Sequence, residues 1–365
     1  MLAVTRLLMG FIMVGFAFGQ TAVQAQDGDS VPDVDFTAIA QNPVLSRGDD
    51  DAWDPGCGTI FAPQVVEREG VFYLFYTGCP RRAGSPGSIG YATSDDGIHW
   101  SKSEHNPILS PDGSGYDAMC ISVGVPVVDG DSWVLYYAAN SKPCAGPGQH
   151  IGRATAASPD GDWQRDDAPV LEAGQPGEWD AGFIMPHAVL RTDSGYVMYY
   201  SAGEEYLVPL SRLVGMATSP DGVHWTKYDD PATVNAPFAD SDPLPRVAAD
   251  GSSEALAVWA LDVLTTETGW EMFFSATCPD QSQQDCPGFI AYARSDDGIH
   301  WTTYPQPAQR LLTPTGVGQP WAAHCICYPS VLRRGSDYWL YFTGCVDGLN
   351  DCQIGMARGT VRWHD

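Results

Sequence analysis

The stretch YATSDDGIHW at residues 91–100 decides the fold, because it recurs almost unchanged as YARSDDGIHW at residues 292–301. Two looser copies lie between them, RATAASPDGDW at residues 153–163 and MATSPDGVHW at residues 216–225. The Asp-Gly pair is typical of a hairpin turn, and the closing tryptophan of a residue that packs between strands. A feature that several repeats share does not mark a single site. We therefore interpret its acids and histidines as structural, namely Asp96, His99, Asp221, His224, Asp297 and His300.

The repeat is longer than the hairpin. An aromatic strand that ends in small residues precedes each copy, and a fifth such strand lies near the end: FYLFYTG, SWVLYYAA, GYVMYYSAG, GWEMFFSA and DYWLYFTG. A further strand, with proline in four of the five cases, precedes each of these, as in APQVV and YPSVL. Short aromatic and alternating strands are typical of antiparallel sheet. Four strands in each unit of about sixty residues predict an all-β, five-bladed β-propeller with four-stranded antiparallel blades.

The first strand of the mature chain is predicted to close the ring. The fifth unit stops at Trp363 without its last strand. The motif QNPVL at residues 41–45 matches HNPIL at 105–109 and DAPVL at 167–171, which follow the hairpins. We expect QNPVL to complete the last blade, so that residues 36–365 form one propeller domain.

The residues before this domain predict export. Residues 1–25 combine Arg6, an apolar run and the small-residue pattern AVQA, which is typical of a secretory signal peptide. Residues 26–35 are polar and predict a disordered linker. We therefore expect a secreted or periplasmic protein, and no segment of the chain is apolar enough to predict a membrane span.

Charge narrows the choice of partner. A net charge of −26 disfavours nucleic acids and anionic membranes, while a neutral carbohydrate remains compatible. The sequence leaves the oligomeric state open.

The positions of the cysteines predict which face of the ring carries the functional site. In an antiparallel blade, the 4→1 and 2→3 connections share one face, here called the mouth face. The long loops and the ten cysteines fall there, and an even number of cysteines in an exported chain predicts disulfides. The pairs expected are Cys57 with Cys79, Cys120 with Cys144, Cys278 with Cys286, and Cys345 with Cys325, Cys327 or Cys352.

A five-unit repeat with FYLFYTG-type strands and SDDGIHW hairpins resembles the superfamily of glycoside hydrolase families 43 and 32 over roughly residues 36–363. The resemblance implies a glycosidase that uses carboxylates from blades one to three as general acid and as base or nucleophile. In those enzymes the first-blade aspartate precedes a proline. Here that position is Ala62, and the matching positions in the next two blades are Val125 and Met185.

Other acids are therefore candidates for catalysis. Asp54, Asp117 and Asp180 each follow an aromatic residue, lie 63 residues apart and fall in equivalent loops. They read either as three carboxylates around the mouth or as a second repeated packing element. Glu204 and Glu205 depart from the repeat, which makes either of them a candidate general acid, with a solvated loop charge as the alternative interpretation.

Other residues of the mouth face are candidates for substrate binding: Trp53, Trp179, His187, Arg212, Trp321, His324 and Tyr328. Aromatic rings stack on the apolar faces of sugars, although blade packing and a core histidine are alternatives. No cofactor is required for this chemistry and no metal-binding motif is present, while an axial calcium ion stays open. The sequence predicts a secreted hydrolase of a neutral oligo- or polysaccharide, with a non-catalytic carbohydrate- or protein-binding propeller as the alternative.

Overall fold

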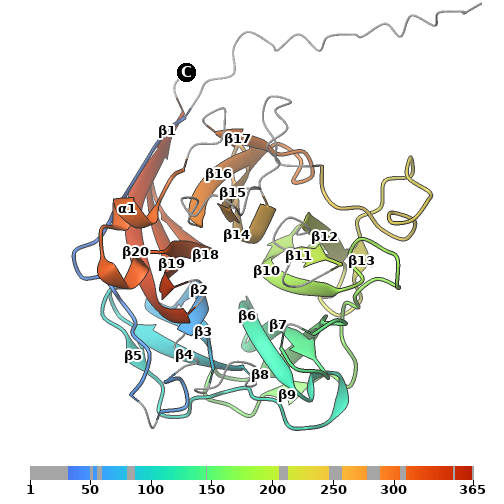
Figure 1. The fold of residues 1–365 in the computed structure, drawn as a ribbon, viewed down its shortest axis with the longest axis horizontal. Coiled ribbons are helices and arrows are strands. Elements are labelled where there is room, and N and C mark those ends of the chain that lie inside the picture. Colours follow the sequence, from blue (N-terminus) through green and yellow to red (C-terminus); the bar gives the residue numbers. More distant parts are fainter. Residues whose placement is uncertain are drawn as a thin grey trace, which may run out of the picture. The chain divides into compact units, whose positions relative to one another are not determined.

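The computed structural model describes residues 32–49, 52–55, 60–79, 87–144, 146–204, 213–245, 257–277, 288–304, 310–347 and 350–363. Five four-stranded antiparallel sheets form the blades of a ring, so the predicted five-bladed β-propeller is confirmed (Figure 1). In each blade the strands run in sequence order from the innermost strand outward, except that the last blade takes its outermost strand from the beginning of the chain.

The strands of each blade have the following bounds. Blade one contains β2 Ile60–Arg68, β3 Val71–Gly78, β4 Ser88–Ser94 and β5 Ser101–Lys102. Blade two contains β6 Cys120–Asp129, β7 Ser132–Asn140, β8 His150–Ala156 and β9 Gln164–Arg165. Blade three contains β10 Phe183–Thr192, β11 Gly195–Gly203, β12 Leu213–Ser219 and β13 Thr226–Lys227. Blade four contains β14 Ala257–Thr266, β15 Gly269–Thr277, β16 Phe289–Ser295 and β17 Thr302–Tyr304. Blade five contains β18 Cys325–Arg334, β19 Asp337–Asp347, β20 Asn350–Arg362 and β1 Asp33–Ala38.

Three one-turn helices lie in 4→1 connections, just before an innermost strand or a little ahead of it. They are η1 Gly115–Asp117, α1 Pro314–Val317 and η3 Pro320–Ala322.

The beginning of the chain closes the ring, although the closing strand is not the one predicted. Strand β1 pairs with β20 from Asp33↔Arg362 to Ala38↔Ala357, and Figure 1 shows the blue β1 beside the red β20. The QNPVL motif follows β1 and forms only the isolated bridge Leu45↔Ile354. The other blades explain this arrangement. The fourth strand begins directly after the hairpin tryptophan, and HNPIL bridges back to the third strand through Ile89↔Leu109. Strand β1 thus begins at Asp33, within the segment 26–35 that the sequence predicts as a linker.

The repeated hairpin is a turn held by side chains. Ser94 Oγ accepts a hydrogen bond from the Gly97 N–H at 2.9 Å, and Asp96 Oδ1 accepts from the Ile98 and His99 N–H groups at 2.8 Å. The His99 ring lies 2.7 Å from Asp96 Oδ2. Residues 219–224 and 295–300 repeat these contacts. These acids and histidines therefore shape turns, as the repeat predicts.

The hairpins also join neighbouring blades. The Tyr341 hydroxyl of blade five donates to the Gly97 carbonyl of blade one at 2.8 Å, and Trp100 packs edge-on against Tyr341. The same pair of contacts joins blade two to blade three, and blade three to blade four. The ten-residue motif recurs because the same contact between neighbouring blades recurs.

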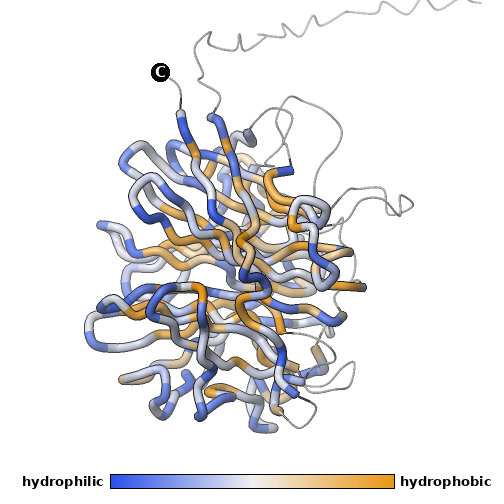
Figure 2. Tube along the Cα trace, turned by 90° about the vertical axis from the view of Figure 1, so that its left-hand side faces the viewer, coloured by the Kyte–Doolittle hydropathy of each residue, from blue (hydrophilic) through white to orange (hydrophobic). Residues whose placement is uncertain are grey.

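Hydrophobic packing fills the spaces between blades. Figure 2 shows hydrophobic residues along the strands and hydrophilic residues mainly at the turns. The largest fully buried side chains include Tyr76, Phe75, Tyr199 and Phe342, all from second strands. Burial of one such aromatic ring contributes about 2–3 kcal/mol. This explains why the aromatic second strand is the clearest repeat in the sequence.

Two predicted disulfides are present on the mouth face. Cys120 pairs with Cys144, and Cys345 pairs with Cys352, which selects one of the three partners considered for Cys345. The other two predicted pairs are Cys57 with Cys79 and Cys278 with Cys286. Cys57, Cys278 and Cys286 lie outside the described residues. Among the described residues, no helix is long and apolar enough to cross a membrane.

Candidate active site

The innermost strands bend at the ring axis. The β2–β3 register shifts between Phe61 and Gln64, and the other four innermost strands have a bulge in the same region. Ala62, Val123 and Tyr328 have positive φ angles of 54°, 48° and 51°. Such angles are unfavourable for residues with a Cβ, and most of all for a β-branched valine, so surrounding contacts must hold them.

Threonines of the preceding blade hold two of these bends. Ala62 N–H donates to Thr343 Oγ1 at 3.0 Å, and Val123 N–H donates to Thr77 Oγ1 at 2.9 Å. Thr77 and Thr343 are both fully buried in equivalent positions of β3 and β19. The threonine that precedes the glycine near the end of these aromatic strands therefore fixes the axial backbone of the next blade.

The side chains around the axis are mainly apolar. Ala62, Val123, Met185, Ala260 and Tyr328 belong to one buried cluster. Two of the three positions where the resemblance implies catalytic carboxylates, Ala62 and Met185, thus lie inside this hydrophobic cluster, and the third, Val125, is buried in another one. Apart from the Tyr328 hydroxyl, the side chains of this cluster offer carbon and sulfur atoms instead of the several oxygen ligands that calcium prefers. We derive no step through an axial calcium ion.

The structure brings two predicted binding residues together at the axis. The rings of His187 from β10 and Tyr328 from β18 have centroids 6.1 Å apart, and Tyr328 packs on Phe61 of β2 at 5.5 Å. His187 is 1% exposed, and its Nε2 lies 2.9 Å from Ser201 Oγ. Three aromatic rings from blades one, three and five therefore meet across the ring.

The environment of Asp54 differs from that of the side chains at the ring axis. It is 1% exposed, accepts a hydrogen bond from the Tyr76 hydroxyl at 3.0 Å and lies 2.5 Å from Lys102 Nζ. Both partners belong to blade one itself. Lys102 follows the hairpin tryptophan, and Tyr76 lies in the aromatic strand, so all three residues occupy repeated positions.

Asp117 and Asp180 repeat this arrangement in their own blades. Asp117 Oδ2 accepts from the Tyr137 hydroxyl at 2.9 Å and lies 3.2 Å from Arg165 Nη1. Asp180 Oδ2 lies 2.5 Å from Lys227 Nζ. Each aspartate thus has a cation from the fourth strand of its own blade. The geometry favours the packing interpretation of the aromatic-aspartate pairs, and a catalytic role for them stays a prediction.

The aromatic members of these pairs pack on their blades. Trp53 lies against Gly78 and Gly90, where an added Cβ would be 2.6 Å and 2.5 Å from its ring. Trp179 stacks on Tyr200 with centroids 6.2 Å apart, and Trp321 stacks on Phe342 at 6.0 Å. Trp179 and Trp321 are buried, so both serve as packing residues in this structure.

The other candidates lie in or near mouth loops. Glu204 directly follows β11 and is exposed, while Glu205 and Arg212 lie outside the described residues. His324 is exposed just before β18, and its N–H donates to the Cys345 carbonyl at 3.0 Å. Glu204 and His324 are thus accessible side chains on the mouth face.

Asp262 on the innermost strand β14 is a buried acid that joins two blades. It accepts the Val331 N–H of blade five at 2.7 Å and its neighbouring Val263 N–H at 2.8 Å. Burial raises the pKa of Asp262 to about 7 in spite of these two donors. Ser330 occupies the matching position in blade five and accepts from Val65 N–H of blade one at 3.0 Å. Both residues therefore act as links between innermost strands.

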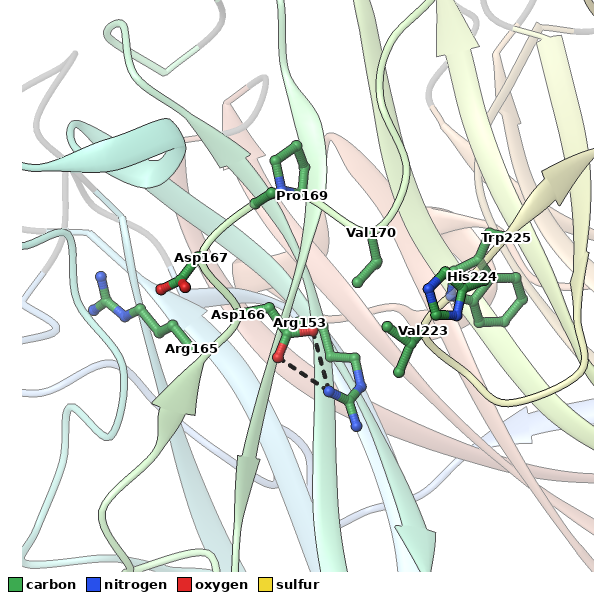
Figure 3. A pocket seen from close by; sticks show the side chains of 10 residues that line it. Arg153, Arg165, Asp166, Asp167, Pro169, Val170, Val223, His224 and Trp225 are labelled. Atoms are coloured by element: carbon green, nitrogen blue, oxygen red, sulfur yellow. Dashed lines mark hydrogen bonds and ion pairs between the residues drawn. The ribbon is translucent and has the colours of Figure 1, made fainter.

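A groove of about 710 Å³ lies between blades two and three, beside the short hairpin turns (Figure 3). One side carries the ion pair of Arg153 and Asp166, at 3.1 Å from one guanidinium nitrogen to both carboxylate oxygens. The other side carries Val223, His224 and Trp225. This groove could not be predicted from the sequence, because its residues belong to the repeats and nothing in the motif marks one space between blades as open.

Comparison with known families supports the resemblance found in the sequence. Residues 63–240 match the glycosyl hydrolases family 32 N-terminal domain, and this segment covers β2 through β13, that is, blades one to three. The uncharacterized protein MT1551 of Mycobacterium tuberculosis (strain CDC 1551 / Oshkosh) is 25% identical over 205 residues, which are 52% of this chain and 61% of the relative. The chain thus spans about 61% of the length of this curated relative.

Solved glycoside hydrolases share the fold. A glycoside hydrolase of 16% identity superposes with a TM-score of 0.67, covering 90% of this chain and 92% of the other. A glycosyl hydrolase from Bacteroides ovatus gives 0.59 at 16% identity, covering 90% and 94%. A thermostable family-43 glycoside hydrolase gives 0.55 at 15% identity, covering 84% and 91%. The resemblance to five-bladed propeller glycoside hydrolases is confirmed.

Proposed function

We propose that this protein is an exported glycoside hydrolase that acts on a neutral oligo- or polysaccharide at its mouth face. The observation that carries the proposal is the match of residues 63–240 to the family 32 domain, because it falls on blades one to three of a complete five-bladed ring. The two disulfides on the mouth face are consistent with an oxidising compartment outside the cytoplasm. A net charge of −26 favours a neutral sugar over an acidic one.

Glu204 and Glu205 are the acids that we assign to catalysis. Hydrolysis needs a carboxylic acid to protonate the leaving oxygen and a carboxylate to act as base or nucleophile. Asp54, Asp117 and Asp180 are each paired with a cation or buried hydroxyl of their own blade. Each binds its cation through Oδ2 and is at most 3% exposed, so a substrate does not reach these carboxylates in the closed structure. Exposed Glu204 has no such constraint.

A specific observation favours a second function, a carbohydrate-binding propeller without hydrolysis. The positions at which the resemblance implies acids, Ala62, Val125 and Met185, hold buried apolar side chains. A chain that has replaced its axial acids by hydrophobic residues retains the ring and the mouth but loses the chemistry of the centre. Sugar binding to the exposed mouth loops would remain.

The two functions give different results in one experiment. The purified full chain is incubated with arabinan, xylan, fructan and aryl furanosides, and bound and released sugars are measured in parallel. We expect release of reducing ends from at least one substrate. Binding without product would instead establish the second function, and neither binding nor release across the panel would contradict both.

Matched variants assign the chemistry. E204Q and E205Q preserve the shape of each side chain and remove its acid, and removal of a general acid or base typically lowers the rate by about 10²–10⁴-fold. E172Q is the control, since Glu172 is an exposed acid of the 4→1 loop before blade three. Equal activity of E204Q, E205Q and E172Q would exclude the glutamate pair.

A further inference from the structure

Three cysteines lie side by side across blade five. Cys325 of β18 is directly opposite Cys345 of β19, and Cys345 is directly opposite Cys352 of β20. Because β19 lies between β18 and β20, Cys345 is the central member and its two neighbours lie on opposite sides. Directly opposed residues in antiparallel strands point to the same face of the sheet. The three sulfur atoms therefore form a row.

The structure places a disulfide at one side of this row. Cys345 is bonded to Cys352, while Cys325 forms no disulfide. The Cys325 and Cys345 sulfurs lie within 4.8 Å of one another. The Cys327 sulfur lies 3.8 Å from that of Cys325 and also within 4.8 Å of that of Cys345, but Cys327 is opposite Thr343 in the sheet and is therefore not a member of the row. Cys345 thus has two cysteine neighbours at equivalent cross-strand positions.

This arrangement satisfies the main requirement for thiol–disulfide exchange. A thiolate attacks a disulfide sulfur from the side opposite the leaving sulfur and passes through a three-sulfur transition state. Cys325 approaches Cys345 from β18, whereas the leaving Cys352 lies on β20. The sheet therefore aligns the attacking, central and leaving sulfurs without any change in strand order.

We propose that Cys325, Cys345 and Cys352 form a disulfide-exchange site in which the bridge moves between two positions. The Cys325 thiolate bonds to Cys345 Sγ, the Cys345–Cys352 bond breaks, and Cys352 leaves as a thiolate. The proton lost from Cys325 is taken up by Cys352 through solvent. The numbers of disulfides and thiols are unchanged, so the step needs no oxidant or reductant.

The two positions stabilise different parts of the mouth face. The Cys345–Cys352 bridge closes the turn between β19 and β20, whereas a Cys325–Cys345 bridge ties the innermost strand β18 to β19. The second position leaves the turn without its covalent link and fixes the strand that carries the axial Tyr328. All three cysteines are at most 9% exposed, so we expect exchange to be slow in the closed ring.

The connectivity of the wild-type chain tests the proposal without any variant. Protein made in an oxidising compartment is incubated at pH 8 with a catalytic amount of reduced glutathione under nitrogen. It is then quenched with acid, alkylated with N-ethylmaleimide, and digested without reduction for mass spectrometry. We expect a new population with a Cys325–Cys345 bridge and alkylated Cys352. The Cys120–Cys144 bridge is the internal control and should keep its single connectivity.

Three variants sharpen the result. C352S, oxidised with glutathione disulfide, should contain the Cys325–Cys345 bridge, whereas C325S should contain only Cys345–Cys352. C327S should exchange as the wild type does, because Cys327 is outside the row. The proposal is overturned if no Cys325–Cys345 bridge forms in the wild type after incubation, or if Cys345 pairs with Cys327 instead. Either result stands even if C352S fails to fold, since the wild-type measurement does not depend on it.

Discussion

The ion pair between Asp54 and Lys102 gives the sharpest test of whether the aromatic-aspartate pairs are structural. Asp54→Asn removes the charge from a side chain that is 1% exposed, and leaves Lys102, which is 26% exposed on its side chain, without its anion. Breaking a fully buried pair costs about 3–5 kcal/mol, and the partial exposure of Lys102 lowers this to about 2–3 kcal/mol. The Tyr76 hydroxyl can still donate to the asparagine carbonyl, so no further loss is expected.

Urea unfolding at pH 7 measures this loss. D54N should lower the free energy of unfolding by about 2–3 kcal/mol, while D95N, at an exposed acid of the hairpin, should change it by less than about 0.5 kcal/mol. K102M should lose about as much as D54N, because it leaves Asp54 buried without its cation. The double variant D54N/K102M should recover much of that loss, since neither charge then remains unpaired. If D54N is as stable as the wild type, or if the two losses simply add, the packing interpretation of Asp54 is wrong.

Three further predictions concern the links between blades and the hairpins. T77V removes the hydroxyl that accepts the buried Val123 N–H, and we expect a loss of about 1–3 kcal/mol in urea unfolding. T93V, at a half-buried threonine of β4 in the same blade, should be near neutral, and equal effects would refute the link. Because burial raises the folded-state pKa of Asp262 to about 7, the unfolded chain ionises this group at lower pH than the folded chain does. The wild type should therefore lose about 3 kcal/mol of stability between pH 5 and pH 8 that D262N does not lose, and parallel pH profiles would contradict this. Hydrogen bonds from the His99 N–H and ring hold the pKa of Asp96 below its ordinary value, so its contribution is present above about pH 4 and is lost at lower pH. D96N should flatten the fall in melting temperature between pH 4 and pH 2.5, and an unchanged fall would show that the hairpin does not depend on this carboxylate.

The blades could be predicted because their determinants are local and repeated. The aromatic second strands and the Asp-Gly hairpins each recur with one physical role, so their joint spacing predicts the ring. The position of the closing strand was missed by a few residues. Strand β1 has the sequence DVDFTA, which matches none of the other outermost strands, and only its pairing with β20 identifies it.

The site was harder to predict because it depends on what lies opposite each side chain. The 63-residue spacing of Asp54, Asp117 and Asp180 is visible in the sequence, but it is equally consistent with a ring of acids and with three separate ion pairs. The cations Lys102, Arg165 and Lys227 favour the second interpretation. Each is the second residue after a hairpin tryptophan, but they lie 47 to 48 residues away from their partners, and nothing in the sequence shows that this position faces the aspartate.

Sugar release by two charge-neutral variants tests the proposed function most directly. Wild type, the double variant E204Q/E205Q and D54N are assayed at equal concentrations of folded protein, well below the melting temperature of D54N, on the substrate that the screen identifies. The proposed function predicts a loss of at least about 10²-fold for E204Q/E205Q and a rate within about twofold of wild type for D54N. Full activity of E204Q/E205Q together with an inactive but folded D54N would contradict it, and would place the chemistry on the aspartates.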